Sequence, residues 1–162
     1  MTRARLDARR HQLKILKLEK RGLKPLATTL LSPHSTATKL AAIGAVSAML
    51  LSLQDAPEAF YRDVAGVGTD HPVTASTVSD ACSLCEHLSQ LVKDDASAER
   101  LYSGVESLFR FVRDSHQAVE AVAKAVGARL IEERPVGGGG KDDPLRWLSQ
   151  LSIGLRGSSS GL

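Results

Sequence analysis

The chain has 162 residues, of which 43% are apolar, 24% are charged and only 4% are aromatic. This length and composition fit one globular domain and exclude a disordered chain. The apolar residues are mostly leucine, alanine and valine, and they lack the aromatic enrichment that is typical of strands. We therefore expect an all-α fold, a compact bundle of about five to six helices.

The longest uncharged run, residues 40–54, has 15 residues and includes several polar ones. A membrane-spanning helix needs roughly 20 apolar residues, so we predict no transmembrane segment. The N-terminus "MTRARLDARR" is charged and has no apolar stretch of the kind a secretory signal requires. These features predict an intracellular protein.

Charge is distributed unevenly along the chain. Residues 1–25 contain nine Lys or Arg against two acids, a net of +7, whereas residues 26–162 contain twelve against sixteen, a net of −4. The sequence therefore predicts a basic N-terminal helical arm at residues 1–25 on an acidic body.

The arm has apolar residues on two sides of its helical projection. Leu6, Leu13 and Leu16 fall near one side, and Ile15 and Leu18 fall on another. We therefore expect this helix to face two surfaces. Gly22 is expected to end it.

Pro25 should reinforce that break, and the turn "LSPHST" should precede the next helix, with Ser35 or Thr36 as its N-cap. The next helix, at about residues 37–53, is apolar nearly all round and includes small residues such as Gly44 and Ala48. We predict that residues 43–50 are the most buried segment of the protein, and that a leucine at Gly44 or Ala48 would overpack it.

Three further helical segments follow in the core region, residues 26–134. A short one follows the capping sequence "DAPE". Another carries apolar residues at three- and four-residue spacings, namely Val78, Cys82, Cys85, Leu88 and Val92. Residues 98–133 continue this periodicity as one helix or two, and we favour a break near Asp114, which resembles a cap.

The C-terminal part combines a glycine-rich segment with a last amphipathic helix. Residues 135–143 are predicted to be a flexible linker, residues 144–156 a helix, and residues 157–162 a disordered tail. The apolar face of this helix is predicted to contact a groove of the body or of a partner helix. It consists of Trp147, Leu148, Leu151 and Leu155.

No residue pattern predicts a catalytic site, a metal site or a cofactor. The run "CSLCEH" supplies two thiols and His87, but a closed zinc site needs four ligands and no second pair follows. Cys82 and Cys85 are therefore expected to be reduced core residues. The run "GGGGKDD" has Asp142 where a phosphate-binding loop has Ser or Thr, so we interpret it as linker.

The cations of the arm are the most suggestive binding candidates. They could bind an acidic protein surface, an import receptor, or the phosphates of RNA or DNA through residues 1–24. No aromatic residue lies among them, so nucleic-acid binding would be electrostatic and weakly sequence-selective. They are Arg3, Arg5, Arg9, Arg10, Lys14, Lys17, Lys20, Arg21 and Lys24.

The same segment carries hints of organelle targeting, although no compartment follows from them. It is Arg-rich and nearly amphipathic, like a mitochondrial presequence, but Asp7 and Glu19 count against that reading. The run "RLDARRHQL" also resembles a peroxisomal N-terminal signal.

Three functional hypotheses follow. The first is a non-catalytic interaction protein that joins a larger assembly, or associates with itself, through its arm and terminal helices. The second is a structural RNA- or DNA-binding protein that uses the arm. The third is an enzyme or ligand carrier with a pocket between helices.

Overall fold

A computed structural model describes residues 3–53, 75–131 and 144–151 of the chain. These residues form helices and short connections, with no strand among them, so the predicted all-α, multi-helix bundle is confirmed for this part of the chain. The helices are α1 (Arg3–Lys17), η1 (Leu18–Leu23), α2 (Lys24–Leu30), α3 (Thr36–Ser52), α5 (Ala75–Lys93), α6 (Ala98–Val126) and a last one at residues 144–151.

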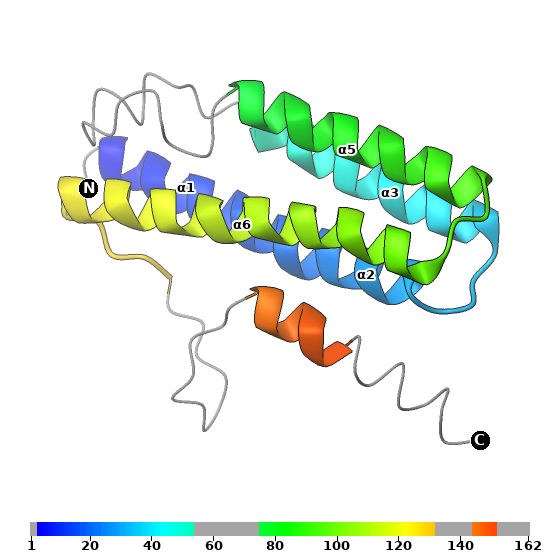
Figure 1. Cartoon of the computed structure of the whole chain (residues 1–162). Helices are drawn as coiled ribbons and strands as arrows, with labels where there is room; N and C mark the ends of the chain where they lie inside the picture. Colours follow the sequence, from blue (N-terminus) through cyan, green and yellow to red (C-terminus); the bar gives the residue numbers. More distant parts are fainter. Residues whose placement is uncertain (1–2, 54–74, 132–143, 152–162) are drawn as a thin grey trace.

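The long helices pack in two layers. Figure 1 shows α3 and α5 side by side in one layer, and α6 beside the rod formed by α1, η1 and α2 in the other. The helix at residues 144–151, drawn in orange, lies against the second layer. One continuous core of mostly Leu, Val and Ile side chains joins the layers.

The N-terminal rod runs without a break through the two residues that were expected to end it. Between α1 and α2 the chain widens into one π-helical turn, in which the Lys24 N–H donates to the Glu19 carbonyl five residues back. Pro25, which has no N–H to donate, lies in the first turn of α2, where helices tolerate proline. The predicted break at Gly22 and Pro25 is therefore wrong.

Gly22 serves close packing rather than chain termination. A Cβ atom at this position would lie 2.9 Å from Sδ of Met49 and 3.4 Å from Cγ2 of Val46. Because both of those residues belong to α3, the missing side chain lets the π-helical turn approach that helix closely.

The prediction that residues 43–50 are the most buried segment is wrong. Only Ile43, Val46 and Leu50 of α3 are buried, and Gly44 and Ala48 are exposed. A Cβ atom added at Gly44 would meet nothing within 4 Å, so the expected overpacking at this position also fails. Alanine and glycine increase the number of apolar residues in a helix but have little apolar surface to bury. The apolar composition of this segment therefore overestimated its burial.

The most extensive buried face belongs to α6, which is a single helix. Ser97 caps its start by accepting a hydrogen bond from the Arg100 N–H, and Gly127, with φ of +68°, ends it in the left-handed conformation that favours glycine. Asp114 lies within the helix, so the expected break there is wrong. The buried residues of α6 recur at three- and four-residue spacings from Leu101 to Ala123.

The periodicity of α5 is confirmed, because Val78, Cys85, Leu88 and Val92 are buried and Cys82 is half-buried. Leu88 packs into the space left by Gly104 of α6, where a Cβ atom would come within 2.6 Å of its Cδ2 atom. The N-cap expected at Ser35 or Thr36 is Ser35.

Several predictions lie outside the described residues: the short helix after "DAPE", the linker at residues 135–143, Leu155 and the tail at residues 157–162. Among the helices that the structure describes, none is long and apolar enough to cross a membrane.

Candidate interaction surfaces

The predicted basic arm folds as α1 and continues into the rod. Its inner face is part of the core, since Ala8, Ile15 and Leu18 are fully buried, mainly opposite α6. Leu6 and Leu13 point to solvent instead, with 39% and 51% of their surface exposed. Of the two apolar sides in the sequence, the side with Ile15 and Leu18 is buried, whereas on the other side Leu6 and Leu13 are exposed and Leu16 is half-buried.

The nine cations of this segment divide by exposure. Arg9, Lys14 and Lys24 are partly buried, and the other six are exposed, namely Arg3, Arg5, Arg10, Lys17, Lys20 and Arg21.

Two of the cations stabilise the ends of neighbouring helices. Arg5 Nε donates to the Val126 carbonyl oxygen at 2.9 Å, and Lys14 Nζ donates to the Ser52 carbonyl oxygen at 3.2 Å. Both carbonyls lie at helix C-termini, where the helix dipole is negative and unpaired acceptors remain. Part of the positive charge of α1 therefore holds the fold together.

Six exposed side chains of α1 and η1 form one line, which we name the outer stripe. All six of its members are exposed, and they follow one another at alternating spacings of three and four residues. They are Arg3, Leu6, Arg10, Leu13, Lys17 and Lys20.

One of the two acids of the segment faces the stripe and the other does not. The half-buried Asp7 lies beside it, in an ion pair with the exposed Arg3 at 3.8 Å. Glu19 faces the interior and is only 5% exposed. Because Glu19 is turned inward and Asp7 pairs with Arg3, the exposed Arg10 and Lys17 present their charge to solvent.

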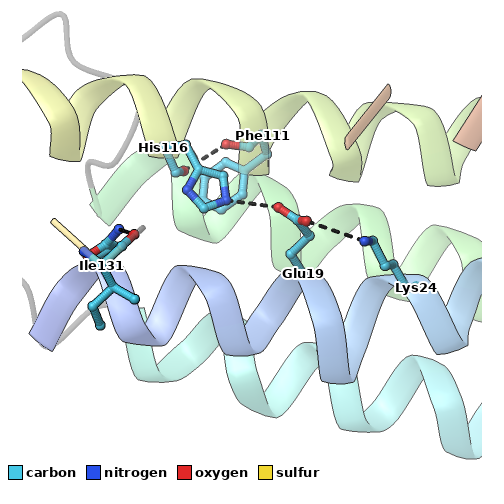
Figure 2. Close-up of polar contacts among 7 residues, drawn as sticks. Glu19, Lys24, Phe111, His116 and Ile131 are labelled. Atoms are coloured by element: carbon cyan, nitrogen blue, oxygen red, sulfur yellow. Dashed lines mark hydrogen bonds and ion pairs between the residues drawn. The ribbon is translucent and has the colours of Figure 1, made fainter. Parts of the chain in front are cut away.

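Glu19 forms a buried polar cluster between the rod and α6. Figure 2 shows its carboxylate between two basic groups: Oε1 lies 2.9 Å from Nε2 of His116, and Oε2 lies 3.7 Å from Nζ of Lys24. A buried carboxylate is costly unless it is paired and hydrogen-bonded, and these two contacts supply the pairing. The cluster thus fixes the register of η1 against α6.

A second polar contact ties α1 to the chain after α6. The Gln12 amide bonds the backbone of Ile131 in both directions: its Nε2 donates to the carbonyl at 3.0 Å, and its Oε1 accepts from the N–H at 2.8 Å. Nearby, the buried Ser115 hydroxyl donates to the Phe111 carbonyl of its own helix. These contacts satisfy polar groups at the α1–α6 interface and position no reactive atom.

The two cysteines behave as core residues. Burial raises the pKa of the Cys85 thiol to about 12, and burial and the charge of Glu86 raise the pKa of Cys82. His87 is exposed. Over the described ranges, no group of three or more His, Cys, Asp or Glu is placed to hold a metal ion.

The helix at residues 144–151 docks onto the body of the same chain. Leu148 is fully buried, and Trp147 stacks on Phe109 of α6 with ring centroids 5.9 Å apart. Lys24 Nζ lies 5.3 Å from the centroid of the Trp147 ring, a cation–π contact. Leu151 packs at the edge of the core.

Sequence reasoning did not identify Gln12 and Glu19 as interior residues. The available signal was the three- and four-residue series through Ala8, Gln12, Ile15 and Glu19, which places both polar residues on the buried face. His116 could not be assigned as a partner, because it lies 97 residues from Glu19 in the chain.

Comparison of the chain with models of protein families, with curated proteins and with solved structures finds no match.

Proposed function

We propose that the protein is a non-catalytic interaction protein that joins a larger assembly through the outer stripe of α1. The observation that supports this proposal is the combination of exposed cations with two exposed leucines on a helix whose opposite face is buried. Large apolar side chains that are exposed on a surface and rimmed by polar or charged side chains are a feature of contact sites.

The rest of the rod supports the same proposal by holding the stripe rigid. Arg5 bonds to the end of α6 and Lys14 to the end of α3, so the backbone that carries the stripe is fixed before any partner arrives. A preorganised surface loses less conformational entropy on binding than a flexible arm does.

Binding to RNA or DNA is the second candidate, favoured by the same exposed cations. It requires a steep loss of affinity with salt, because each phosphate contact releases a counterion. Leu6 and Leu13 count against it, since a phosphate backbone offers them no apolar surface.

The test uses charge reversal on the folded protein. Deletion of residues 1–24 is unsuitable because it would remove part of the core. We would immobilise the full chain and the double variant Arg10→Glu/Lys17→Glu, capture proteins from an extract with and without nuclease, and identify them by mass spectrometry. Arg129→Glu is the matched control, since Arg129 is exposed but lies outside the rod.

We expect that, with nuclease present, the wild type and the Arg129→Glu control capture the same partner protein. The double variant should fail to capture it. Capture that the double variant leaves unchanged contradicts it. Capture that disappears on nuclease treatment favours the nucleic-acid alternative.

A further inference from the structure

The outer stripe has the geometry of a seam for a second helix. Arg3, Arg10 and Lys17 are seven residues apart, and Leu6 and Leu13 are also seven apart, between them. This alternation of three and four residues is the heptad spacing by which one helix packs along another. From residue 3 to residue 20 the seam is about 25 Å long, at about 1.5 Å per residue.

The chemistry of the seam restricts what can cover it. In the described part of the chain, Leu6, Leu13 and Leu51 are the exposed large hydrophobic residues, and two of the three lie on the seam. Arg10 and Lys17, which flank Leu13, make no hydrogen bond or ion pair with described residues. A partner must therefore offer apolar groups and negative charge on the same face.

Three other occupants fit this chemistry less well. A second copy of the seam would bring Arg and Lys against Arg and Lys, which is unfavourable. A nucleic acid supplies negative charge but leaves the leucines uncovered. A bilayer surface requires a continuous apolar face, whereas cations separate the leucines of the seam, and Ile15 and Leu18 are already buried in the bundle.

Resting on the proposed function, we infer that the outer stripe binds one acidic amphipathic helix of a partner protein. Apolar side chains of that helix cover Leu6 and Leu13, and its Asp or Glu side chains pair with Arg10 and Lys17. In this complex the negative charge of the partner helix determines which helix binds. The two leucines set the register of that helix against α1.

The test measures direct binding of a defined probe to the full chain. The probe is a labelled synthetic peptide of about three heptads, with leucine at the seam positions and glutamate beside them. A scrambled peptide of the same composition has the same charge but no apolar face. Fluorescence anisotropy gives the Kd of each.

The inference expects the ordered peptide to bind about tenfold or more tightly than the scrambled one, a difference that charge alone does not produce. Leu13→Ser and Arg10→Glu/Lys17→Glu should each weaken the binding about tenfold. Leu51→Ser is the matched control, because Leu51 is 52% exposed and Leu13 is 51% exposed. It and Arg129→Glu should leave the Kd unchanged, and circular dichroism should show that all variants are folded.

Equal binding of the ordered and scrambled peptides would overturn the inference, as would tighter binding to phosphatidylserine vesicles or to a single-stranded RNA oligonucleotide. If the peptide does not bind but the capture experiment still loses a protein on Arg10→Glu/Lys17→Glu, the inference fails and the proposed function stands. If neither experiment responds to the double variant, both fail.

Discussion

Nε2 of His116 on α6 lies 2.9 Å from Oε1 of Glu19 on η1, and this contact joins residues that are 97 positions apart in the sequence. Glu19 also faces Lys24, so one buried carboxylate serves two basic groups. The pair lies at the π-helical turn, where the rod changes its winding.

Removing the charge of Glu19 should destabilise the fold. Glu19→Gln keeps the size of the side chain but leaves two partly buried basic groups without their anion. We expect the free energy of unfolding to fall by about 1–3 kcal/mol, less than for a fully buried pair because Lys24 is partly exposed. Urea denaturation followed by circular dichroism measures the change.

Asp7→Asn is the matched control, because Asp7 is a half-buried acid of the same rod whose only described ion pair is with the exposed Arg3. Its effect should stay below about 0.5 kcal/mol. Equal effects of the two substitutions would show that the buried cluster contributes nothing beyond a surface ion pair.

Two glycines in helices should respond in opposite directions to alanine. Gly44 has open space around it, so Gly44→Ala should raise the free energy of unfolding by about 0.5–1 kcal/mol through helix propensity. At Gly104 the added methyl group meets the buried Leu88, and overpacking should outweigh that gain, giving a net loss on the order of 1 kcal/mol. Thermal melts of both variants decide this, and a stabilising Gly104→Ala would contradict the close α5–α6 contact.

The buried thiol of Cys85 should make stability depend on pH in the alkaline range. Its pKa is about 12 in the folded chain against 9.0 for the unperturbed thiol, so between these values the unfolded state loses a proton that the folded state keeps. The contribution of this thiol to the free energy of unfolding is therefore constant below pH 9. Above pH 9 it falls, by up to about 1.4 kcal/mol per pH unit.

Comparison with Cys85→Ala isolates that effect, because the other titrating groups are common to both proteins. The difference in unfolding free energy between wild type and variant should shrink as the pH rises from 9 to 11. A difference that is independent of pH would contradict the burial of this thiol. At pH 8, an alkylating reagent should modify the half-buried Cys82 faster than Cys85.

Trp147 should report the docking of the helix at residues 144–151 in the isolated protein. Since its ring stacks on Phe109, its fluorescence emission should lie at shorter wavelength than in urea-unfolded protein. Phe109→Leu removes the stack and should shift the emission to longer wavelength. Phe111→Leu, at a half-buried neighbour on α6, should not. Emission typical of a fully hydrated indole in the native wild type would mean that the helix does not dock.

Signals within a few residues of the sequence were sufficient to predict helices whose faces and caps are set by neighbouring side chains. The apolar period of α5, the cap at Ser35 and the apolar face around Leu148 follow from spacing and side-chain chemistry within a few residues. The continuity of the rod did not follow, because Gly22 is accommodated by Met49 of another helix. At this position tertiary packing keeps the helix continuous, although glycine is locally a helix-breaking residue.

The candidate surface was predictable in part. The cations of the first 25 residues were evident from the sequence, but which of them bond to other helices depends on distant residues such as Ser52 and Val126. The exposure of Leu6 and Leu13 was left open by the two-sided pattern. Only the position of α6 decides which side of α1 is buried.

The pairing of α1 with α6 also has a consequence for synthesis on the ribosome. Arg5 and Val126, which bond in the folded protein, are 121 residues apart. Translation adds about 5–20 residues per second, so the C-terminal end of α6 is synthesised on the order of ten seconds after α1. During that time the side chains of Ile15 and Leu18 have no α6 to cover them, so the nascent chain presents a basic helix with apolar residues on both faces. A chaperone that recognises such helices would meet this protein early in its translation, before the bundle closes.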